Sequence, residues 1–210
     1  DIPMLSATGT PDATSFLRGD NTWSVPASGN TAVEYPYTTD FQSGVSQTRD
    51  LSVLTATSGY NNNTNLTSLY IGSKITEIGF EGVKSCANLT DVTIPNSVTI
   101  IGDSSFLACT NLAEIVIPNS VLDIKSYAFN ACSSLASATI GAGVTQIRDE
   151  AFKDCTALAS VSSLNPVAPT LTLTPGSGVF SNILATTIDV PVGATGYGTT
   201  YGGLTVNYVL

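Results

Sequence analysis

Four cysteines recur with one 23-residue period, at Cys86, Cys109, Cys132 and Cys155. Four thiols can hold a zinc ion, and an even number of thiols can form disulfides. If equivalent residues lie at the spacing of neighbouring β-strands, about 4.8 Å, the four thiols span on the order of 15 Å and cannot surround one ion with Zn–S bonds of about 2.3 Å. Side chains in register also point the same way, which disfavours disulfides. The sequence therefore predicts four buried free thiols.

Asp91 and Glu114 are the carboxylates whose spacing could support catalysis, because they too stand one period apart. On adjacent strands their Cβ atoms would lie about 5 Å apart, which is compatible with the carboxyl separation of about 5 to 5.5 Å in retaining glycosidases. Their flanking equivalents are Ser68 and Ser137, however, and the chain has no histidine, the commonest general base and metal ligand. We therefore expect a protein that is not an enzyme and that uses neither a metal nor a cofactor.

These residues belong to a unit that repeats through the middle of the chain. Units open at Leu66, Leu89, Leu112 and Leu135, and a degenerate fifth unit opens at Leu158. The second unit reads LTDVTIPNSVTIIGDSSFLACTN. A period of about 20 to 29 residues, with leucine and isoleucine at set positions, is typical of leucine-rich repeats. The predicted fold class is therefore mainly β, a solenoid that places each residue beside its copies.

The apolar positions of the unit predict where the core lies. Val92 and Ile94 alternate with polar residues, as in a strand with one buried face, and Val98 and Ile101 form a second buried pair. The equivalent residues form three columns: Ile71, Ile94, Ile117 and Ile140; Ile78, Ile101, Ile124 and Ile147; and Phe106, Phe129 and Phe152, with Val83 in the first unit. Such columns indicate a packed interior rather than a ligand pocket.

The unit from Leu89 to Thr110 resembles the BspA-like leucine-rich repeats, whose pattern runs roughly L-x-x-V-x-I-P-x-x-V-x-x-I-G-x-x-A-F-x-x-C. The resemblance covers residues 66–157 well. The first unit departs from the pattern, with Gly72 in place of the proline and Val83 in place of the phenylalanine, and terminal repeats are expected to be atypical because they cap the stack. The tail from Val161 resembles the segment that closes such arrays.

A second resemblance lies near the N-terminus, where residues 8–26 read TGTPDATSFLRGDNTWSVP. This stretch is similar to a short motif of bacteriophage tail-fibre and tail-collar proteins, G-T-P-x-x-x-x-F-L-R-G-D-x-T-W. The resemblance implies a virion fibre, usually a homotrimer, attached to other virion tail proteins through a small apolar knot of Phe16, Leu17 and Trp23. We expect Gly19 to Asn21 to form the turn that folds this knot.

Arg18, Gly19 and Asp20 also spell the tripeptide that integrins recognise. Because all three belong to the longer motif, we interpret them as part of its turn. Four segments follow from these patterns: a linker or attachment motif at 1–30, an N-terminal β cap at 31–65, four repeats at 66–157, and a degenerate repeat with a C-terminal cap at 158–210. The chain starts at Asp1 without a methionine, which is typical of a fragment or a processed piece.

Composition narrows the range of partners. The net charge is −9, and the seven basic residues are not clustered, which argues against nucleic acid and anionic membranes. No apolar run is long enough to span a membrane. Only 11% of the residues are charged, in a chain long enough for one sizeable core.

The remaining chemistry is binding, through side chains on the exposed faces of the strands. Repeat proteins commonly bind along such faces. Two rows are the predicted contacts: Ser68, Asp91, Glu114 and Ser137, and beside them Tyr70, Thr93, Val116 and Thr139. Tyr197, Tyr201 and Tyr208 are rival contacts in a tail that could equally be a flexible cap.

The N-terminal resemblance implies a non-catalytic tail-fibre or related virion adhesion protein, which as a fibre of this kind would be a homotrimer. We expect its repeats to bind a host cell-surface protein or polysaccharide. The alternatives are a secreted or cell-surface BspA-like bacterial adhesin, and a structural virion part without a receptor.

Overall fold

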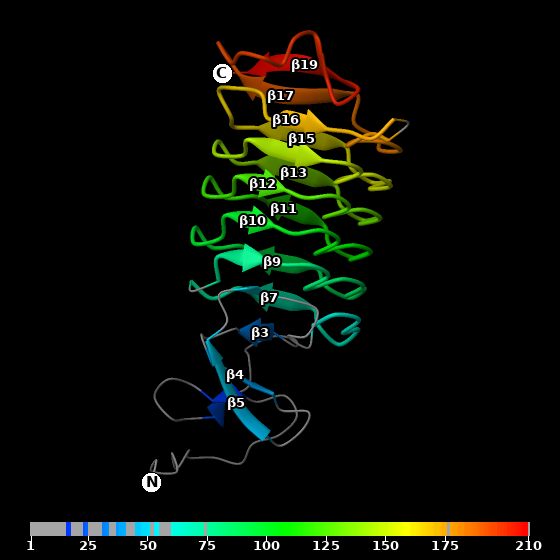
Figure 1. Cartoon of the computed structure of the whole chain (residues 1–210). Coiled ribbons are helices and arrows are strands. Elements are labelled where there is room, and N and C mark those ends of the chain that lie inside the picture. The colour runs from blue at the N-terminus through cyan, green and yellow to red at the C-terminus, as the bar shows by residue number, and fades with distance from the viewer. Residues whose placement is uncertain are drawn as a thin grey trace.

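The protein is a stack of β-coils, mainly β, with the N-terminal segments at one end and β19 at the other (Figure 1). This computed structural model describes residues 60–209 apart from 74 and 176, together with the backbone of six short strands between residues 16 and 54. The described residues include no helix. The strands before the repeats are β1 Phe16–Leu17, β2 Trp23–Ser24, β3 Thr31–Val33, β4 Tyr37–Asp40, β5 Val45–Asp50 and β6 Val53–Leu54.

Each repeat contributes one strand to each of two faces of parallel strands, which we call the first and the second sheet. The first sheet face is built by β7 Ser68–Tyr70, β9 Asp91–Thr93, β11 Glu114–Val116, β13 Ser137–Ile140, β15 Ser160–Ser163, β17 Thr187–Pro191 and β19 Leu204–Val209, with β18 Thr200–Tyr201 beside β19. This first sheet is divided between β9 and β11. The second sheet contains β8 Glu77–Ile78, β10 Ile100–Ile101, β12 Asp123–Ile124, β14 Gln146–Arg148 and β16 Thr170–Thr172, and begins with β6. Neighbouring strands in the second sheet pair in register, so that Ile78 lies beside Ile101 and Ile124 beside Ile147. The period of the sequence therefore becomes one coil per repeat, as predicted.

A turn segment closes each coil and joins it to the next by backbone hydrogen bonds. Two positions of this segment carry positive φ in non-glycine residues, for example Tyr127 at 59° and Ala131 at 58°. This conformation costs about 1–2 kcal/mol per residue. Bonds to the neighbouring coil offset the cost: Tyr127 N donates to Asp149 O at 3.0 Å, and Ala131 N donates to Lys153 O at 2.9 Å. The turn segments thus form a third side of each coil, beside the two sheets. Backbone hydrogen bonds join this side to the neighbouring coils, although it contains no strand.

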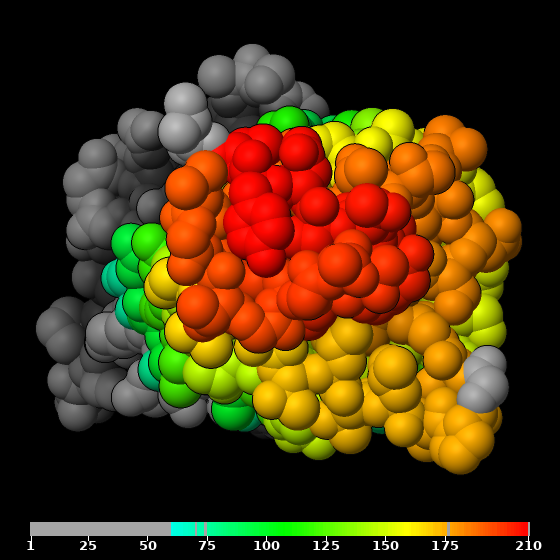
Figure 2. Space-filling view, turned by 90° about the horizontal axis from the view of Figure 1, so that it is seen from above, coloured from blue at the N-terminus to red at the C-terminus, as the bar shows by residue number. Residues whose placement is uncertain are grey.

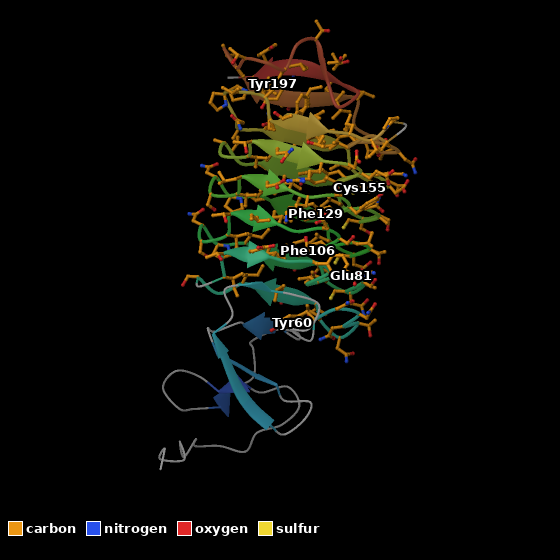
Figure 3. All side chains as sticks on the ribbon, in the orientation of Figure 1. Tyr60, Glu81, Phe106, Phe129, Cys155 and Tyr197 are labelled. Atoms are coloured by element: carbon orange, nitrogen blue, oxygen red, sulfur yellow. The ribbon has the colours of Figure 1, made fainter. Side chains whose placement is uncertain are left out.

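The predicted isoleucine and phenylalanine columns form the core. Phe106 stacks on Phe129 (Figure 3), with ring centroids 5.2 Å apart. Phe129 stacks in turn on Phe152, with ring centroids 5.1 Å apart. Phe180, from the degenerate fifth unit, stacks on Phe152 at 5.5 Å and continues the column. Every residue of the two isoleucine columns is buried.

The four cysteines form a column of buried free thiols, as the sequence predicted. Each donates to a backbone carbonyl of the preceding coil, for example Cys109 Sγ to Val83 O at 3.1 Å and Cys132 Sγ to Phe106 O at 3.2 Å. Burial raises the pKa of Cys86 to about 11 and that of Cys155 to about 12. The thiols therefore stay protonated at neutral pH and act as small core residues.

Further strands extend the stack at both ends. At the N-terminal end, β3 pairs with β7 and β6 pairs with β8, both in parallel, while β4 and β5 form a separate antiparallel pair. At the C-terminal end, β17 pairs with β15 and β19 pairs with β17, again in parallel. The antiparallel strand β18 covers only the beginning of β19, at Leu204 and Thr205.

The prediction that Tyr197 and Tyr201 are surface contacts is wrong. Both side chains are buried in the C-terminal cap, where their rings meet edge to face at 5.0 Å. The hydroxyl of Tyr197 donates to Asn165 O at 3.0 Å, and the hydroxyl of Tyr201 donates to Pro169 O at 2.8 Å. Because their hydroxyls have hydrogen-bond partners, these large rings can fill the end of the core, and the segment around them packs on the core as a cap.

Candidate binding face

The outer face of the first sheet carries both predicted rows. Strand pairing places Ser68 beside Asp91 and Glu114 beside Ser137, one residue per coil. Asp91 and Glu114 are exposed and Ser137 is half-buried. Side chains alternate along a strand, so the next residue on each strand points into the core, as Ile115 does after Glu114. The alternation seen in the sequence is therefore what turns the first row outward.

The second row runs parallel to the first along the same strands. Thr93 and Val116 are exposed and Thr139 is half-buried. Val116 is 61% exposed, and it is the apolar side chain among the described residues of this row. Tyr70 lies on β7 in register with Thr93, but its side chain is outside the described part of the structure.

The structure extends both rows into the C-terminal cap, which sequence reasoning missed. The first row continues through Ser160, Thr187 and Thr205, and the second row continues through Ser162, Asp189 and Asn207. The fifth coil is longer than the others, so the later residues of both rows fall outside the register of the repeats. The alternation of polar and apolar residues in TTIDVP and LTVNYV was the signal that could have found them.

Hydrogen bonds hold several side chains of this face in fixed positions. Asn207 Nδ2 donates to Asp189 Oδ1 at 2.7 Å, and Ser162 Oγ donates to Thr139 Oγ1 at 3.3 Å. Thr90 Oγ1 donates to Asp91 Oδ2 at 2.6 Å. Side chains already held by such bonds lose less conformational freedom when a partner binds.

The first sheet is interrupted between β9 and β11. The two strands belong to different sheets, and the backbone hydrogen bond from Ala113 N to Thr90 O is long, at 3.5 Å. Asp91 and Glu114 occupy equivalent positions of consecutive coils, but they do not face each other in a strand pair. The strand pairing from which a glycosidase-like carboxyl separation was inferred is thus absent between β9 and β11.

The described cations lie on the other sides of the coil. Lys84 pairs with Glu81 at 2.6 Å and Lys153 with Glu150 at 3.0 Å, both in turn segments. Arg148, on the second sheet, forms two hydrogen bonds to the Asp123 carboxylate, at 3.1 and 2.7 Å, which raise the pKa of its guanidinium.

The two rows of the first sheet thus carry three carboxylates, Asp91, Glu114 and Asp189, and none of the described cations. This face is electrically negative and rich in hydroxyl groups. Such a surface favours neutral or positively charged partners over polyanions.

A shallow hollow of about 330 Å³ lies away from this face, between the fourth and fifth coils. Thr145, Asn165 and Thr170 supply its polar groups, and its lining includes no charged residue. Within the described ranges, no three of the residues Cys, Asp and Glu gather as a metal ion would require. Residues 60–209, where described, also contain no helix that could cross a membrane.

The predicted attachment residues lie on a two-stranded hairpin. β1 pairs with β2 in antiparallel fashion, so that Leu17 lies beside Trp23 and Phe16 beside Ser24. This backbone reversal agrees with the turn expected at Gly19 to Asn21. The side chains of Phe16, Leu17 and Trp23, and the residues 18–22 between the strands, lie outside the described part of the structure.

Comparison with known proteins identifies the repeats. Residues 56–159 match the BspA type leucine-rich repeat region in six copies. This match agrees with the BspA-like resemblance of the repeats, and the coils have the leucine-rich repeat fold expected from it. A search among curated proteins gives no match.

Three solved structures are similar to the chain. A leucine-rich repeat protein from Bacteroides ovatus is 19% identical with a TM-score of 0.49, over 77% of this chain and 37% of that one. A leucine-rich repeat protein of T. pallidum is 20% identical with a TM-score of 0.49, over 83% and 90%. A leucine-rich cell surface protein from Faecalibacterium prausnitzii is 23% identical with a TM-score of 0.49, over 88% and 56%. The chain thus spans little more than a third of the B. ovatus protein.

Proposed function

We propose that this protein is a non-catalytic adhesion protein that binds a protein or polysaccharide on another cell through the outer face of its first sheet. The observation that supports this proposal is the face itself. Two polar rows run along it from β7 to the C-terminal cap, and hydrogen bonds hold several of their side chains in place. Extended faces of this kind are how repeat proteins commonly bind.

The proposal places the protein outside the cell, with the repeats displayed at a bacterial surface. The match of residues 56–159 to BspA type leucine-rich repeats supports this location, because the resemblance to BspA-like repeats implies a secreted or cell-surface adhesin. Neither a metal nor a cofactor is needed for binding of this kind. Nucleic acid is a poor partner for a face that carries carboxylates and none of the described cations.

A virion fibre is the second candidate, favoured by one observation. Residues 8–26 carry the tail-fibre-type motif, and the hairpin of β1 and β2 agrees with its expected turn. In this candidate the hairpin joins the repeats to other virion tail proteins, the assembly is a homotrimer, and the same face binds the host receptor. A structural virion part without a receptor would use the hairpin of β1 and β2 for assembly. The outer face of its first sheet would bind no partner.

The proposal is tested by the binding of the labelled chain to intact bacteria and to animal cells. Glu114→Lys reverses an exposed charge in the first row, and Glu77→Lys makes the same charge change on the second sheet as a matched control. We expect saturable binding that Glu114→Lys weakens by about tenfold or more and Glu77→Lys leaves unchanged. Equal loss in both variants, or in neither, would overturn the choice of face.

The two candidates are separated by competition. Saturable binding to particular bacterial strains that blocks phage adsorption supports the fibre. Binding to animal cells or to their matrix proteins supports the bacterial adhesin. A correctly folded chain that binds no cell type would contradict the adhesion proposal itself.

A further inference from the structure

The first sheet consists of two separate sections. β3, β7 and β9 form the N-terminal section, and the strands from β11 to β19 form the C-terminal section. Figure 2 looks down the stack onto the C-terminal section, whose last strands cover the coils beneath them. β9 and β11 follow one another in the stack (Figure 1), yet they are not paired. The neighbouring steps, from β7 to β9 and from β11 through β13 to β15, are all paired in register.

The backbone hydrogen bonds of this step differ from those of the equivalent steps. The amides of Ile71 and Ile117 each donate to a carbonyl of the following coil, at 3.2 and 2.9 Å. Ile94 occupies the same position in the second repeat. Residues 89–116 are all described, and within them the Ile94 amide makes no such bond. The step between the second and third coils is therefore open on the side of the first sheet.

The other two sides of the same step are closed. On the second sheet, Leu122 N donates to Thr99 O at 2.8 Å. On the turn side, Phe106 N donates to Ala128 O at 2.8 Å, and the ring of Phe106 stacks on that of Phe129. The second and third coils thus remain joined along two of their three sides and are separated only along the first sheet.

The core is more accessible beneath this gap than at the neighbouring repeats. Val92 points inward at the position that Leu69, Ile115 and Ala138 occupy in the other repeats. Those three side chains are buried, whereas Val92 is half-buried. The gap therefore leaves an inward-facing apolar side chain partly in contact with solvent, which costs free energy that closing the gap would recover.

The charges along the first row account for the position of the gap. Asp91 and Glu114, both exposed, are consecutive carboxylates in this row. Each of the two flanking steps, Ser68 to Asp91 and Glu114 to Ser137, combines a carboxylate with a hydroxyl group, and each is paired. Like charges directly opposite each other destabilise a pair of strands. The sheet is thus unpaired at the step where pairing would set two carboxylates side by side.

We propose that the step between β9 and β11 is a hinge of the solenoid, which repulsion between Asp91 and Glu114 holds open. In the closed form β9 pairs with β11 as β7 pairs with β9, and the first sheet becomes continuous from β3 to β19. The two sections rotate about the second sheet and the turn side, where the hydrogen bonds persist. Closing buries Val92 and adds backbone hydrogen bonds, but it brings the Cβ atoms of the two acidic residues to about 5 Å.

Amide hydrogen exchange of the full chain, resolved by residue with NMR, tests the hinge. We expect the amide of Ile94 to exchange at least about tenfold faster than those of Ile71 and Ile117. The amides of Leu122 and Phe106, on the two closed sides of the same step, should be protected as well as those of Ile71 and Ile117. Equal protection of Ile94 would overturn the hinge. Fast exchange at Leu122 and Phe106 would also overturn it, because the whole coil would then unfold instead of opening on one side.

Neutral variants test the role of the two carboxylates. Asp91→Asn and Glu114→Gln nearly keep the size of the side chain and remove one charge each. Each should favour the closed form and slow the exchange of the Ile94 amide by about twofold to fivefold, relative to Ile71 and Ile117 in the same variant. Glu77→Gln makes the same change on the second sheet and is the matched control, which should leave the Ile94 amide unchanged.

An Ile94 exchange rate that neither Asp91→Asn nor Glu114→Gln changes would overturn the claim that repulsion holds the hinge open. Equal slowing in Glu77→Gln would overturn it too, because the effect would then belong to the charge of the chain as a whole. Slowing in the two first-row variants alone supports the proposal.

Discussion

Phe180 stacks on Phe152 with ring centroids 5.5 Å apart and an angle of 18° between the rings, although the two lie further apart in the sequence than one repeat. The other members of the column stand exactly one repeat apart and stack at 5.1 and 5.2 Å. The fifth coil therefore has longer connecting segments than the other coils, and its phenylalanine still stacks at the end of the column. Compared with the other repeats, the fifth unit keeps the core position of its phenylalanine but differs in the length of its connecting segments.

The central ring of this column should dominate stability. Phe129→Ala removes stacking on both sides and leaves a cavity in a fully buried site, so we expect the free energy of unfolding to fall by about 3–5 kcal/mol. Tyr127→Ala, at an exposed position nearby in the same turn segment, is the control and should cost much less. Urea unfolding followed by circular dichroism measures both. Similar losses in the two variants would contradict the assignment of the column as the core.

The hydroxyl of Tyr197 should matter to the cap. It contacts Ser163 Oγ at 2.7 Å and donates to Asn165 O at 3.0 Å, both in buried surroundings. Tyr197→Phe removes both contacts and leaves Ser163 Oγ with the 3.3 Å bond that it accepts from Asn165 N. Because buried polar groups then lose a partner, we expect the cap to be destabilised by about 1–3 kcal/mol. Tyr208→Phe removes a hydroxyl from a partly exposed side chain and should be nearly neutral. Hydrogen exchange of the amides of β17 and β19 reports the effect, and equal protection in both variants would argue against a closed cap.

The cysteine column should make stability fall at alkaline pH. Burial raises the pKa of Cys86 from its ordinary value of 9.0 to about 11 in the folded chain. The unfolded state therefore loses thiol protons first, and folding stability is lost as the pH rises from about 9 towards 11. Cys86→Ala removes the contribution of this thiol and should make the pH dependence less steep over that window, while the other three buried thiols keep theirs. An unchanged slope in Cys86→Ala, measured by urea unfolding at several pH values, would show that other groups are responsible.

The same thiols should be inert in the native chain. At pH 8 the folded protein should resist iodoacetamide, whereas the urea-unfolded protein should gain four carbamidomethyl groups without prior reduction, because all four cysteines are free. Intact mass spectrometry counts the groups. Fewer than four after unfolding would reveal a disulfide.

The repeats were predictable because the same side chains return at a fixed interval. Ile94 and Ile101 each belong to a column whose members are all buried, so the burial pattern of one repeat predicts that of the other three. The period also correctly placed the free thiols of the cysteine column. Local periodicity was sufficient here because each coil contacts mainly its neighbours.

The cap was less predictable because its contacts join segments that share no period. Tyr197 bonds to Ser163 and Asn165, which lie far earlier in the chain and at no fixed interval. Its surroundings in the sequence, rich in glycine and threonine, are typical of exposed loops, and this led to the wrong expectation of a surface contact. The continuation of the two surface rows to Asp189 and Asn207 was missed for the same reason, since the longer fifth coil breaks the register.

The central claim is that the outer face of the first sheet meets the partner. It is tested most directly with a photo-crosslinking amino acid placed either at Thr139, in the second row, or at Gln146, on the second sheet of the same coil. The chain is bound to the cells it recognises and irradiated. We expect a covalent adduct from position 139 and none from position 146. An adduct from position 146 alone would contradict binding through the first sheet and would place the partner on the second sheet.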